Sequence, residues 1–521
     1  MNSTTLARNI LRQCIELGIS DFVLSPGSRN APLSIALYEA ESAGLVNLYV
    51  RIDERGAAFF ALGLSKASNN YVAVICTSGT AAANFHPAAL EAYHSENRLI
   101  FITADRPAHL RRTGASQTTL QVGVLEPLSS IDISTTVAIS PLLDSGPIHL
   151  NIQFDEPLLG DDRSDWLAGL SPQIKNSEHF PVDPAFFPKS RGVVIVGHDR
   201  AGIDSMSICA YASAIGWPLI AEDPLSFPCS ISHAALILSD PALRSSLQPE
   251  QVIVIGRPTL SRSINALIKE SADVVVIDPR ALTIDTARTS SLCLQALPEA
   301  HPAQDQNWLR QWKQLSDLAA AHLQLDWSEQ AALQLISANI PNGAALFVGS
   351  SRPVRDIEAF ASPRSGIYTF ANRGLAGIDG NIACAFGIAE KFERSFAILG
   401  DITFLHDISA LVNPTTSNLT IFIVDNNGGG IFNTLPQADV TGFEKIFATP
   451  HNLDLERLIH GFGAEVSKVK NSSDLLRSIT NNPQGLNFVV LEVPNRAANA
   501  DKLREITQSL ISALRIGSNL A

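Results

Sequence analysis

Short runs of apolar and β-branched residues recur along this chain, and they constrain its fold more than any other feature. Val193–Val196 and Leu419–Val424 are two examples. Runs of this length without a charged residue are typical of strands buried on both faces of a parallel sheet. Longer stretches with helical spacing of apolar residues separate them, which is the βαβ pattern. The sequence therefore predicts an α/β fold of doubly wound parallel sheets.

The alternation of strands and helices falls into three blocks. A chain of 521 residues is also too long for a single core. Pro, Asp and Ser accumulate between residues 161 and 190, a composition typical of a linker. We expect three α/β domains, over residues 1–165, 190–330 and 340–521. The expected strands are 22–24, 48–51, 72–76, 99–103 and 148–152 in the first domain, 193–196, 252–255 and 274–277 in the second, and 395–400 and 419–424 in the third. Helices are expected over 1–17, 304–340 and 501–514.

The composition argues against several classes of partner and location. The net charge is −13 and no block rich in Lys or Arg is present, which disfavours binding to nucleic acid or to an anionic membrane. No apolar stretch approaches the ~20 residues of a spanning helix, so no membrane insertion is expected. The first residues lack the cationic start and apolar block of a secretion signal. The six cysteines are scattered without a CxxC pair and are expected to be reduced and mostly buried, as in a cytoplasmic protein.

Two polar motifs follow two consecutive apolar runs in the last domain. Gly400-Asp401 ends the first run, and Asn426-Asn427 ends the next, so that Asp401 and Asn426 are 25 positions apart. That interval has room for one helix and one strand. Both motifs are therefore expected at the carboxyl edge of neighbouring strands, where open α/β sheets bind ligands. Each motif alone is typical of an ordinary turn, but together, at this spacing, they favour a binding site.

The oxygen donors in these motifs suit a magnesium diphosphate. Asp401 offers a carboxylate, Asn426 an amide oxygen and Gly428 a backbone carbonyl, the ligands that Mg²⁺ or Mn²⁺ accepts. A helix that starts after Asp401 would direct its free N–H groups at the diphosphate, and the glycines let the backbone approach closely. His406 and Asp407 are expected to be helix-surface or packing residues.

The Gly-Asp and Asn-Asn motifs resemble the diphosphate-binding motif of thiamine-diphosphate enzymes. Further segments narrow the resemblance: Ser25-Pro-Gly-Ser-Arg29, Thr77-Ser-Gly-Thr80, Thr103-Ala-Asp-Arg-Pro107, Ser351-Arg-Pro-Val-Arg355 and Asn372-Arg-Gly374. Together they resemble the 2-succinyl-5-enolpyruvyl-6-hydroxy-3-cyclohexene-1-carboxylate synthase family of menaquinone biosynthesis, least clearly in the middle domain. The resemblance implies three doubly wound domains of the thiamine-diphosphate-enzyme type. The first would bind the pyrimidine ring, and the last would bind the diphosphate and Mg²⁺.

The resemblance also implies which residues hold the thiamine diphosphate. Glu54 would bind the aminopyrimidine ring and promote removal of a proton from the thiazolium carbon. The alternative is a surface salt bridge between Glu54 and Arg51 or Arg55. Ile378 and Phe432 would be apolar props that keep the cofactor bent, although Phe432 fits a core position equally well. The remaining implied cofactor contacts are Gly400, Asp401, Asn426, Gly428, Gly430 and Ile431.

The substrates implied by the resemblance are 2-oxoglutarate and isochorismate, which are both dicarboxylates. Arginine binds a carboxylate through two parallel hydrogen bonds, so an acidic chain needs local arginines for this task. Ser28, Arg29 and Gln117 are expected to be catalytic as well as substrate-binding. The full set of candidate substrate contacts is Ser28, Arg29, Arg106, Ser116, Gln117, Arg262, Ser351, Arg355, Arg373 and Leu435. Ser116 departs from the family, which often has Asn there.

The implied activity is that of a transferase of aldehyde or ketone groups. It would decarboxylate 2-oxoglutarate and add the resulting succinyl-semialdehyde carbanion to isochorismate in a 1,4 sense. The family implies a homodimer in which Glu54 of one subunit completes the site of the other, and a homotetramer built as a pair of dimers.

Two alternatives stay open at this point. One is another thiamine-diphosphate decarboxylase or carboligase, such as an acetolactate-synthase-like enzyme. The other is a non-catalytic cofactor-binding regulator, since a fold alone does not fix function; a mere binder would not need Glu54. A dinucleotide site is disfavoured because Gly197-His-Asp-Arg-Ala-Gly202 departs from the GxGxxG pattern, and a plain turn is expected there.

Overall fold

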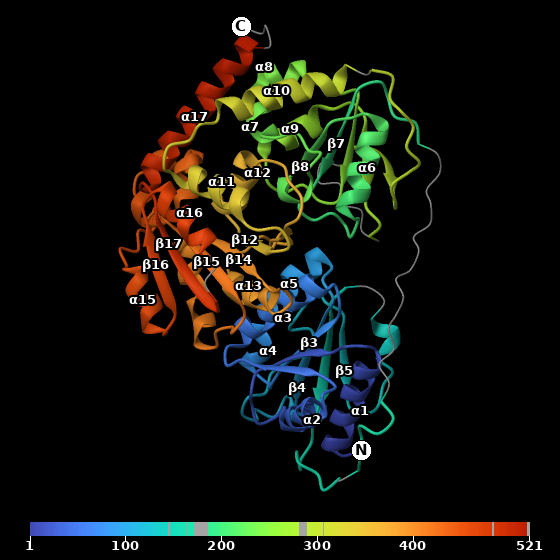
Figure 1. Ribbon diagram of the computed structural model, residues 1–521. Coiled ribbons are helices and arrows are strands. Elements are labelled where there is room, and N and C mark those ends of the chain that lie inside the picture. The colour runs from blue at the N-terminus through green and yellow to red at the C-terminus, as the bar shows by residue number, and fades with distance from the viewer. Residues whose placement is uncertain are drawn as a thin grey trace. The chain divides into compact units, whose positions relative to one another are not determined.

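The computed structural model of the chain contains three sheets with helices packed on their faces (Figure 1). It describes residues 1–143, 146–162, 164–170, 186–280, 289–305, 307–481 and 484–517. Neighbouring strands pair in parallel in all three sheets, so the predicted α/β fold class is confirmed. The chain divides into two compact units. Unit 1 comprises residues 1–177, 374–395 and 403–419, and unit 2 comprises residues 178–373, 396–402 and 420–521.

The first sheet lies in unit 1 and has the strand order β2-β1-β3-β4-β6-β5. Its strands are β1 (Asp21–Leu24), β2 (Asn47–Val50), β3 (Val72–Cys76), β4 (Leu99–Asp105), β5 (Ser130–Ile133) and β6 (Ile148–Gln153). The helices of this region are α1 (Ser3–Glu16), α2 (Ala31–Ser42), α3 (Glu54–Ser68), α4 (Thr80–Asn84) and α5 (His86–Ser95), with 3₁₀ turns η1 (Ala108–Leu110) and η2 (Ser140–Leu142). β3 and β4 are buried at every residue, as predicted. β5 was not predicted, because only its last residue is buried.

The second sheet lies in unit 2 and has the order β11-β10-β9-β7-β8. Its strands are β7 (Gly192–Val196), β8 (Leu219–Ala221), β9 (Gln251–Ile255), β10 (Val274–Ile277) and β11 (Ser290–Leu294). The helices are α6 (Ser205–Ile215), α7 (Ala234–Ile237), α8 (Pro241–Ser246), α9 (Arg262–Glu270), α10 (Trp308–His322) and α11 (Glu329–Asn339), with η3 (Pro224–Ser226). The helical stretch expected over 304–340 is therefore two helices. The segment 197–202 forms a turn, as expected, with Ala201 and Gly202 at positive φ.

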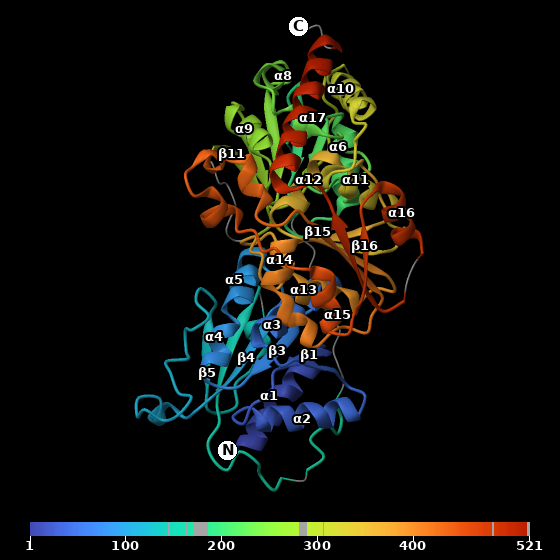
Figure 2. The same ribbon diagram turned by 90° about the vertical axis from the view of Figure 1, so that its left-hand side faces the viewer.

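The third sheet has the order β13-β12-β14-β15-β17-β16. Its strands are β12 (Ala345–Val348), β13 (Tyr368–Phe370), β14 (Ser395–Gly400), β15 (Leu419–Asp425), β16 (Glu465–Val469) and β17 (Leu486–Glu492). The helical elements are α12 (Arg352–Phe360), α13 (Asn381–Ala389), α14 (Asp401–His406), η4 (Ile408–Val412), η5 (Gly430–Thr434), η6 (Pro436–Asp439), the π-helical η7 (Glu444–Ala448), α15 (Leu455–Gly461), α16 (Ser472–Thr480) and α17 (Arg496–Gly517). α17 is longer than predicted and lies alongside α10, where Leu510 and Leu514 share a core with Trp308 and Trp312 (Figures 1 and 2).

Two of the cysteines contradict the sequence analysis, which expected only reduced thiols. Cys209 in α6 and Cys229 after η3 form a disulfide, with their Cα atoms 6.1 Å apart. Both residues belong to the same core of the second sheet, and this packing brings together two thiols that are 20 residues apart in sequence. Among the described residues the free cysteines are Cys14, Cys76 and Cys384, all buried, and Cys293, which is exposed.

Part of the expected linker over 161–190 lies outside the described residues, which omit 171–185. In the described part, Trp166, Leu167 and Leu170 pack against the core of the first sheet. No helix in the described ranges is long and apolar enough to cross a membrane.

In unit 1, α3 and α13 approach each other so closely that glycine is required in both helices. A Cβ on Gly63 of α3 would lie 2.1 Å from the carbonyl oxygen of Cys384 in α13. A Cβ on Gly387 of α13 would lie 2.1 Å from the carbonyl oxygen of Phe60 in α3. Since these neighbours are main-chain atoms, no side-chain rotation can relieve such a contact.

The start of α13 is held by Asp407, which is fully buried as a packing residue, whereas His406 beside it is exposed. The Oδ2 of Asp407 accepts the N–H groups of Ile382 (2.8 Å) and Ala383 (3.0 Å). Arg55 lies 3.5 Å from Oδ1. Burial nevertheless raises the pKa of Asp407 to about 6 from an ordinary value of 3.8.

Replacing Gly63 tests the helix contact. Gly63→Ala should lower the free energy of unfolding by about 3 kcal/mol, because overpacking forces the two main chains apart. Gly461→Ala is the matched control, since a Cβ at that helical position meets no atom within 4 Å; it should change stability by less than ~1 kcal/mol. Urea unfolding followed by circular dichroism measures both. Equal unfolding midpoints for Gly63→Ala and the wild type would contradict the packing argument.

Replacing Asp407 tests its buried charge. The folded pKa of about 6 lies above the ordinary 3.8, so the ionised form is disfavoured in the fold and stability is lost as pH rises through this window. Asp407→Asn keeps an acceptor for α13 without the charge. The wild type should therefore lose roughly 3 kcal/mol of stability relative to Asp407→Asn between pH 4 and pH 7. Denaturant unfolding of both proteins across this range measures the difference, which a pH-independent result would refute.

Candidate active site

The two polar motifs of the last domain meet at one edge of the third sheet. β14 and β15 are neighbours in the sheet, and Asp401 and Asn426 follow their carboxyl ends. The N–H of Gly428 donates to Oδ2 of Asp401 (2.8 Å), and the N–H of Ile402 donates to Oδ1 (2.6 Å). Asp401 is 2% exposed. The predicted juxtaposition of the motifs is therefore present in the structure.

The donor set at this edge fits a divalent cation. The amide Nδ2 of Asn426 donates to the buried carboxylate of Glu329, which orients the side chain. The Oδ1 of Asn426 is buried and accepts no hydrogen bond. A buried oxygen without a donor is costly unless a cation binds it. Asp401, the free Oδ1 of Asn426 and the carbonyl of Gly428 thus offer the oxygen ligands that Mg²⁺ prefers.

The glycines after Asn427 are required by the close approach of the backbone. Gly428 has φ +138°, and a Cβ there would lie 2.3 Å from the carbonyl oxygen of Ala448. The N–H of Gly429 donates to that same carbonyl (2.7 Å). A Cβ on Gly430 would lie 2.6 Å from Nδ2 of Asn426. The loop can therefore pass close to Asn426 only with glycine at these positions.

Three ionisable residues near Asp401 were missed by the sequence analysis. Asp425 is the last residue of β15, and His451 lies in the segment after η7; their ligand atoms and those of Asp401 lie within 4.8 Å of one another. Glu329 begins α11, where burial, with a further contribution from Asp356, raises its pKa to about 7. Asp425 could have been noticed beside Asn426. His451 and Glu329 come from distant parts of the chain, and no sequence signal marks them.

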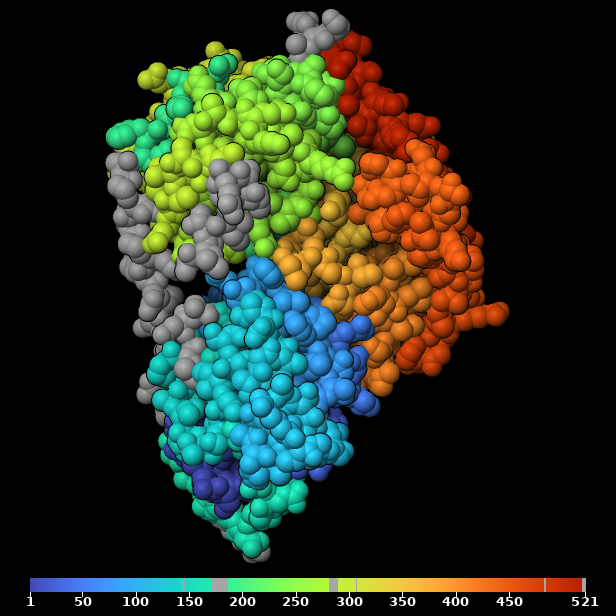
Figure 3. Space-filling model, turned by 180° about the vertical axis from the view of Figure 1, so that it is seen from behind, coloured from blue at the N-terminus to red at the C-terminus, as the bar shows by residue number. Residues whose placement is uncertain are grey.

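The apolar candidates of unit 2 lie along η5. Ile431, Phe432 and Leu435 are each half-buried, and the ring of Phe432 packs 5.5 Å from that of Phe447. Leu435 lines a cavity of about 590 Å³ together with Arg262 at the start of α9 and Arg504 of α17. Figure 3 shows this face, with the orange η5–η6 surface beside the green helices of the second sheet and red α17. Arg262 and Leu435, both proposed from the sequence, thus share one cavity.

Arg373 is held by the second sheet. It is 5% exposed, and its Nε and Nη2 donate to Oγ1 of Thr259 (3.2 and 2.9 Å). Arg257 donates to the carbonyl of Arg373 (2.6 Å). Buried Glu222, after β8, accepts the N–H groups of Leu260 (2.6 Å) and Thr259 and so fixes this loop. The loop after β9 thus positions Arg373, a contact that the sequence did not show.

Arg355 and Ser351 lie together at the start of α12. Nη1 of Arg355 donates to the carbonyl oxygen of Ser351 (2.6 Å), and Ser351 has φ +75°. Burial lowers the pKa of Arg355, and the charge of Arg352 lowers it further. Arg352 pairs with buried Asp356, and the carboxylates of Glu358 and Glu222 also act on Arg355, so the guanidinium groups lie among buried acidic groups.

In unit 1, Glu54 is the first residue of α3, after the cap residue Asp53. The alternative role of Glu54, a salt bridge with Arg51 or Arg55, is not what the contacts of these arginines show. Arg51 stacks 3.7 Å from the centre of the Phe60 ring, and Arg55 contacts the carbonyl of His406 (3.0 Å) and Asp407. Glu54 is half-buried, a setting compatible with the role implied by the resemblance.

Ile378 also belongs to unit 1, in the loop before α13. Buried Glu91 of α5 fixes the start of this loop by accepting the N–H groups of Gly374 (2.7 Å) and Leu375 (2.7 Å). At the other end, a Cβ on Gly380 would lie 1.9 Å from the Phe59 ring of α3. Ile378 itself is half-buried, so part of its side chain is free to contact a ligand.

The substrate candidates of unit 1 gather after β1, β3 and β4. Nη1 of Arg106 donates to Oγ of Ser78 (3.0 Å) and to the carbonyl of Gln117 (2.8 Å). The backbone N–H of Arg29 donates to Oγ1 of Thr77 (3.3 Å). Burial lowers the pKa of Arg106, and the charge of Arg29 lowers it further. Ser28, Ser116 and Gln117 are exposed in this chain.

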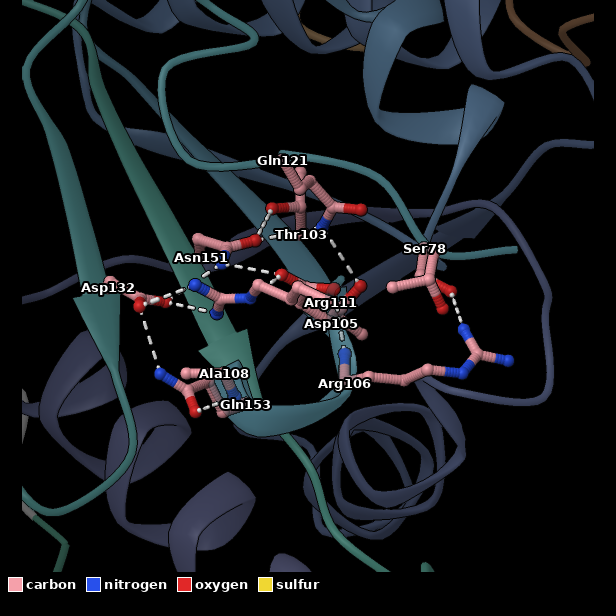
Figure 4. A network of polar contacts seen from close by, with 12 residues as sticks. Ser78, Thr103, Asp105, Arg106, Ala108, Arg111, Gln121, Asp132, Asn151 and Gln153 are labelled. Atoms are coloured by element: carbon pink, nitrogen blue, oxygen red, sulfur yellow. Dashed lines mark hydrogen bonds and ion pairs between the residues drawn. The ribbon is translucent and has the colours of Figure 1, made fainter. Parts of the chain in front are cut away.

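A buried polar network supports Arg106, as Figure 4 shows. Asp105 accepts the N–H of Arg106 (2.7 Å) and pairs with Arg111 (2.8 Å). Gln121 accepts the N–H of Gly79 (3.0 Å) and donates to Asn151 (2.8 Å), which in turn donates to Asp105 (3.0 Å). These residues were not predicted, because their roles depend on contacts between strands.

Comparisons with known proteins agree with these observations. The family described as thiamine pyrophosphate enzyme, N-terminal TPP binding domain, matches residues 4–124. The middle-domain family matches 162–348, and the C-terminal TPP binding domain matches 354–493. A benzoylformate decarboxylase from Polynucleobacter necessarius has a similar structure, with a TM-score of 0.65, 16% identity and coverage of 95% of this chain and 99% of that one. At that identity the likeness shows the fold alone.

Full-length relatives narrow the family. A 2-succinyl-5-enolpyruvyl-6-hydroxy-3-cyclohexene-1-carboxylate synthase from Nocardioides sp. is 36% identical over 97% of this chain and 98% of its own length. Synthases of the same name from Thermobifida fusca and Lysinibacillus sphaericus are 34% and 31% identical, over 98% and 99% of this chain and 100% and 99% of their own. The chain therefore belongs to the thiamine-diphosphate-dependent 2-succinyl-5-enolpyruvyl-6-hydroxy-3-cyclohexene-1-carboxylate synthase family.

Proposed function

We propose that this chain is a 2-succinyl-5-enolpyruvyl-6-hydroxy-3-cyclohexene-1-carboxylate synthase of menaquinone biosynthesis. It decarboxylates 2-oxoglutarate and adds the remaining succinyl-semialdehyde unit to isochorismate, releasing CO₂. The observation that carries the proposal is the near-full-length match, at 31–36% identity, to relatives that bear this name. The geometry of Asp401, Asn426 and Gly428 supports it, since their oxygens would suit a metal diphosphate.

The proposed cofactor is thiamine diphosphate with Mg²⁺, for which Mn²⁺ is a substitute. Asp401, Oδ1 of Asn426 and the carbonyl of Gly428 would hold the metal. When bound, the cofactor supplies a nucleophilic carbon and an electron sink for decarboxylation. The apolar side chains of Ile378 and Phe432 would exclude water and support its rings. Gly400, Gly430 and Ile431 complete the proposed cofactor contacts.

Glu54 is proposed to hold a proton at the aminopyrimidine ring. A carboxyl group shielded from water can exchange a proton with a ring nitrogen near neutral pH. We propose a homodimer in which Glu54 of one copy serves the metal site of the other, with two dimers forming a tetramer. The three-domain division at 1–165, 190–330 and 340–521, like the cytoplasmic location, stays a prediction.

The arginines are proposed to bind the carboxylates of the two substrates. Arg29 and Arg106 in unit 1, and Arg355 and Arg373 in unit 2, are each fixed by contacts to neighbouring groups. A guanidinium group that is already fixed loses little conformational entropy when it binds a carboxylate. The other proposed substrate contacts are Ser28, Ser116, Gln117, Arg262, Ser351 and Leu435.

The purified protein should consume isochorismate only when 2-oxoglutarate, thiamine diphosphate and Mg²⁺ are all present. Isochorismate loss and CO₂ release, measured together, should occur in equal amounts, because one decarboxylation supplies one addition. Pyruvate in place of 2-oxoglutarate is the control. Turnover of pyruvate with isochorismate untouched would favour an acetolactate-synthase-like enzyme, and cofactor binding without any turnover would favour a regulator.

Glu54→Gln should lower kcat by at least ~100-fold while leaving the fold and the binding of thiamine diphosphate nearly unchanged, because proton transfer typically contributes 10²–10⁴-fold. Calorimetric titration of the cofactor and steady-state rates measure the two effects. Glu39→Gln, at a part-exposed position in α2, is a matched control that should retain activity. Normal turnover of Glu54→Gln would remove Glu54 from the mechanism.

A further inference from the structure

His451 lies at the proposed metal site although no part of the motif contains it. Its Nε2 is 3.3 Å from Oδ2 of Asp401 and 3.8 Å from Oδ1 of Asp425. The side chains of His451 and Asp401 are 8% and 3% exposed, so water competes little for this contact. A partner so close to a metal ligand can determine how that ligand is presented.

The segment that carries His451 is fastened to the glycine loop. The side chains of Asn427 and Asn452 form a reciprocal pair: Nδ2 of Asn427 donates to Oδ1 of Asn452 (2.9 Å), and the N–H of Asn452 donates to Oδ1 of Asn427 (2.9 Å). The N–H of Gly429 donates to the carbonyl of Ala448 (2.7 Å). Asn427 therefore fixes the segment that carries His451 next to Asn426, the proposed metal ligand that precedes Asn427 in the motif.

The hydrogen bonds of the imidazole fix its tautomer. Nδ1 accepts the backbone N–H of Leu453 (3.0 Å), so Nδ1 carries no proton. The proton of the neutral ring must then lie on Nε2, which faces Asp401. His451 therefore donates a hydrogen bond to Oδ2 of Asp401, and that nitrogen has no lone pair left for a metal.

The tautomer of His451 decides whether it is a metal ligand together with Asp401 and Asp425 or a residue that positions Asp401. A three-ligand site would need a lone pair on Nε2, which the contact with Leu453 prevents. To position Asp401, His451 needs only its Nε2–H. The buried Oδ1 of Asn426, which accepts no hydrogen bond, points to a metal bound through oxygen. Nε2 of His451 also lies near the carboxylate of Asp425 (3.8 Å).

We propose that His451 is a positioning residue for the divalent metal. Its Nε2–H holds the Asp401 carboxylate in the orientation that ligates the cation. The inference rests on the metal site of the proposed function. Loss of such a contact to a metal ligand typically weakens metal binding by about 10- to 100-fold.

The test uses Mn²⁺ as the probe with the full-length protein and saturating thiamine diphosphate, and it needs no substrate. Free Mn²⁺ is counted by electron paramagnetic resonance. His451→Leu should weaken Mn²⁺ binding by about tenfold or more. His451→Gln, whose amide N–H can reach the position of Nε2, should stay within about threefold of the wild type. Unchanged affinity in His451→Leu, or equal losses in both variants, would overturn the proposal.

A second measurement identifies the role of the nitrogen directly. Pulsed electron paramagnetic resonance of Mn²⁺ in the wild type should show no imidazole nitrogen in direct coordination; a coordinated nitrogen would overturn the proposal. Because this measurement uses the wild type, it tests the proposal even if His451→Leu fails to fold, which circular dichroism would show. Asp401→Asn should abolish tight Mn²⁺ binding. If it does not, the metal site of the proposed function fails together with this inference, whereas an effect of Asp401→Asn without one of His451→Leu refutes His451 alone.

Discussion

The contact between the Asp401 carboxylate and the N–H of Gly428 joins the ends of two neighbouring strands, and the site depends on it. It brings Asp401, Asn426 and Gly428 together at the edge of the sheet. The loop can adopt this path only because Gly428 and Gly430 have no Cβ. The fixed backbone then leaves Oδ1 of Asn426 buried and without a donor. The backbone path that only glycine allows therefore leaves this oxygen available to a cation.

The second sheet contributes to the site by positioning a side chain that lies outside it. Glu222 accepts backbone N–H groups of the loop after β9, and that loop holds Arg373 through Thr259. The buried Glu222 carboxylate thus fixes the backbone of this loop, and the loop in turn fixes the guanidinium group of Arg373. The polar network around Asp105 does the same for Arg106 in unit 1. In both places an arginine proposed to bind substrate is held by groups that themselves face no substrate, a division typical of preorganised sites.

The sequence predicted most strands that are long and uniformly buried. It missed β8, which is buried but only three residues long, and it predicted β2 from its apolar residues although none of them is buried. β3, β4, β14 and β15 were predicted because nearly every residue in them is buried and apolar. β5, β11 and β16 were not, because most of their residues are at least partly exposed and lack the apolar run. α17 was predicted too short for another reason: the buried residues of its first turns, Asn499 and Ala500, are polar or small and give no apolar pattern.

Within the site, the motif residues could be predicted and their supports could not. The spacing of Asp401 and Asn426 follows from chain geometry, since one helix and one strand return the chain to the same edge. His451, Glu329 and Glu222 reach the site through folding alone, and nothing in their neighbouring residues marks them. The disulfide of Cys209 and Cys229 was missed for the same reason, because the sequence does not show which face of a sheet two segments share.

The glycine contact between α3 and α13 has a consequence for how the site tolerates change. Glu54 is the first residue of α3, and Ile378 lies three residues before α13. The spacing of these two helices is set by main-chain atoms in direct contact at Gly63 and Gly387, not by the size of any side chain. Substitutions elsewhere in the core of unit 1 can therefore alter its packing without changing the separation of Glu54 and Ile378. In the proposed dimer Glu54 serves the site of the partner and Ile378 the site of its own chain, so the two glycines set the spacing between two sites and not a distance within one.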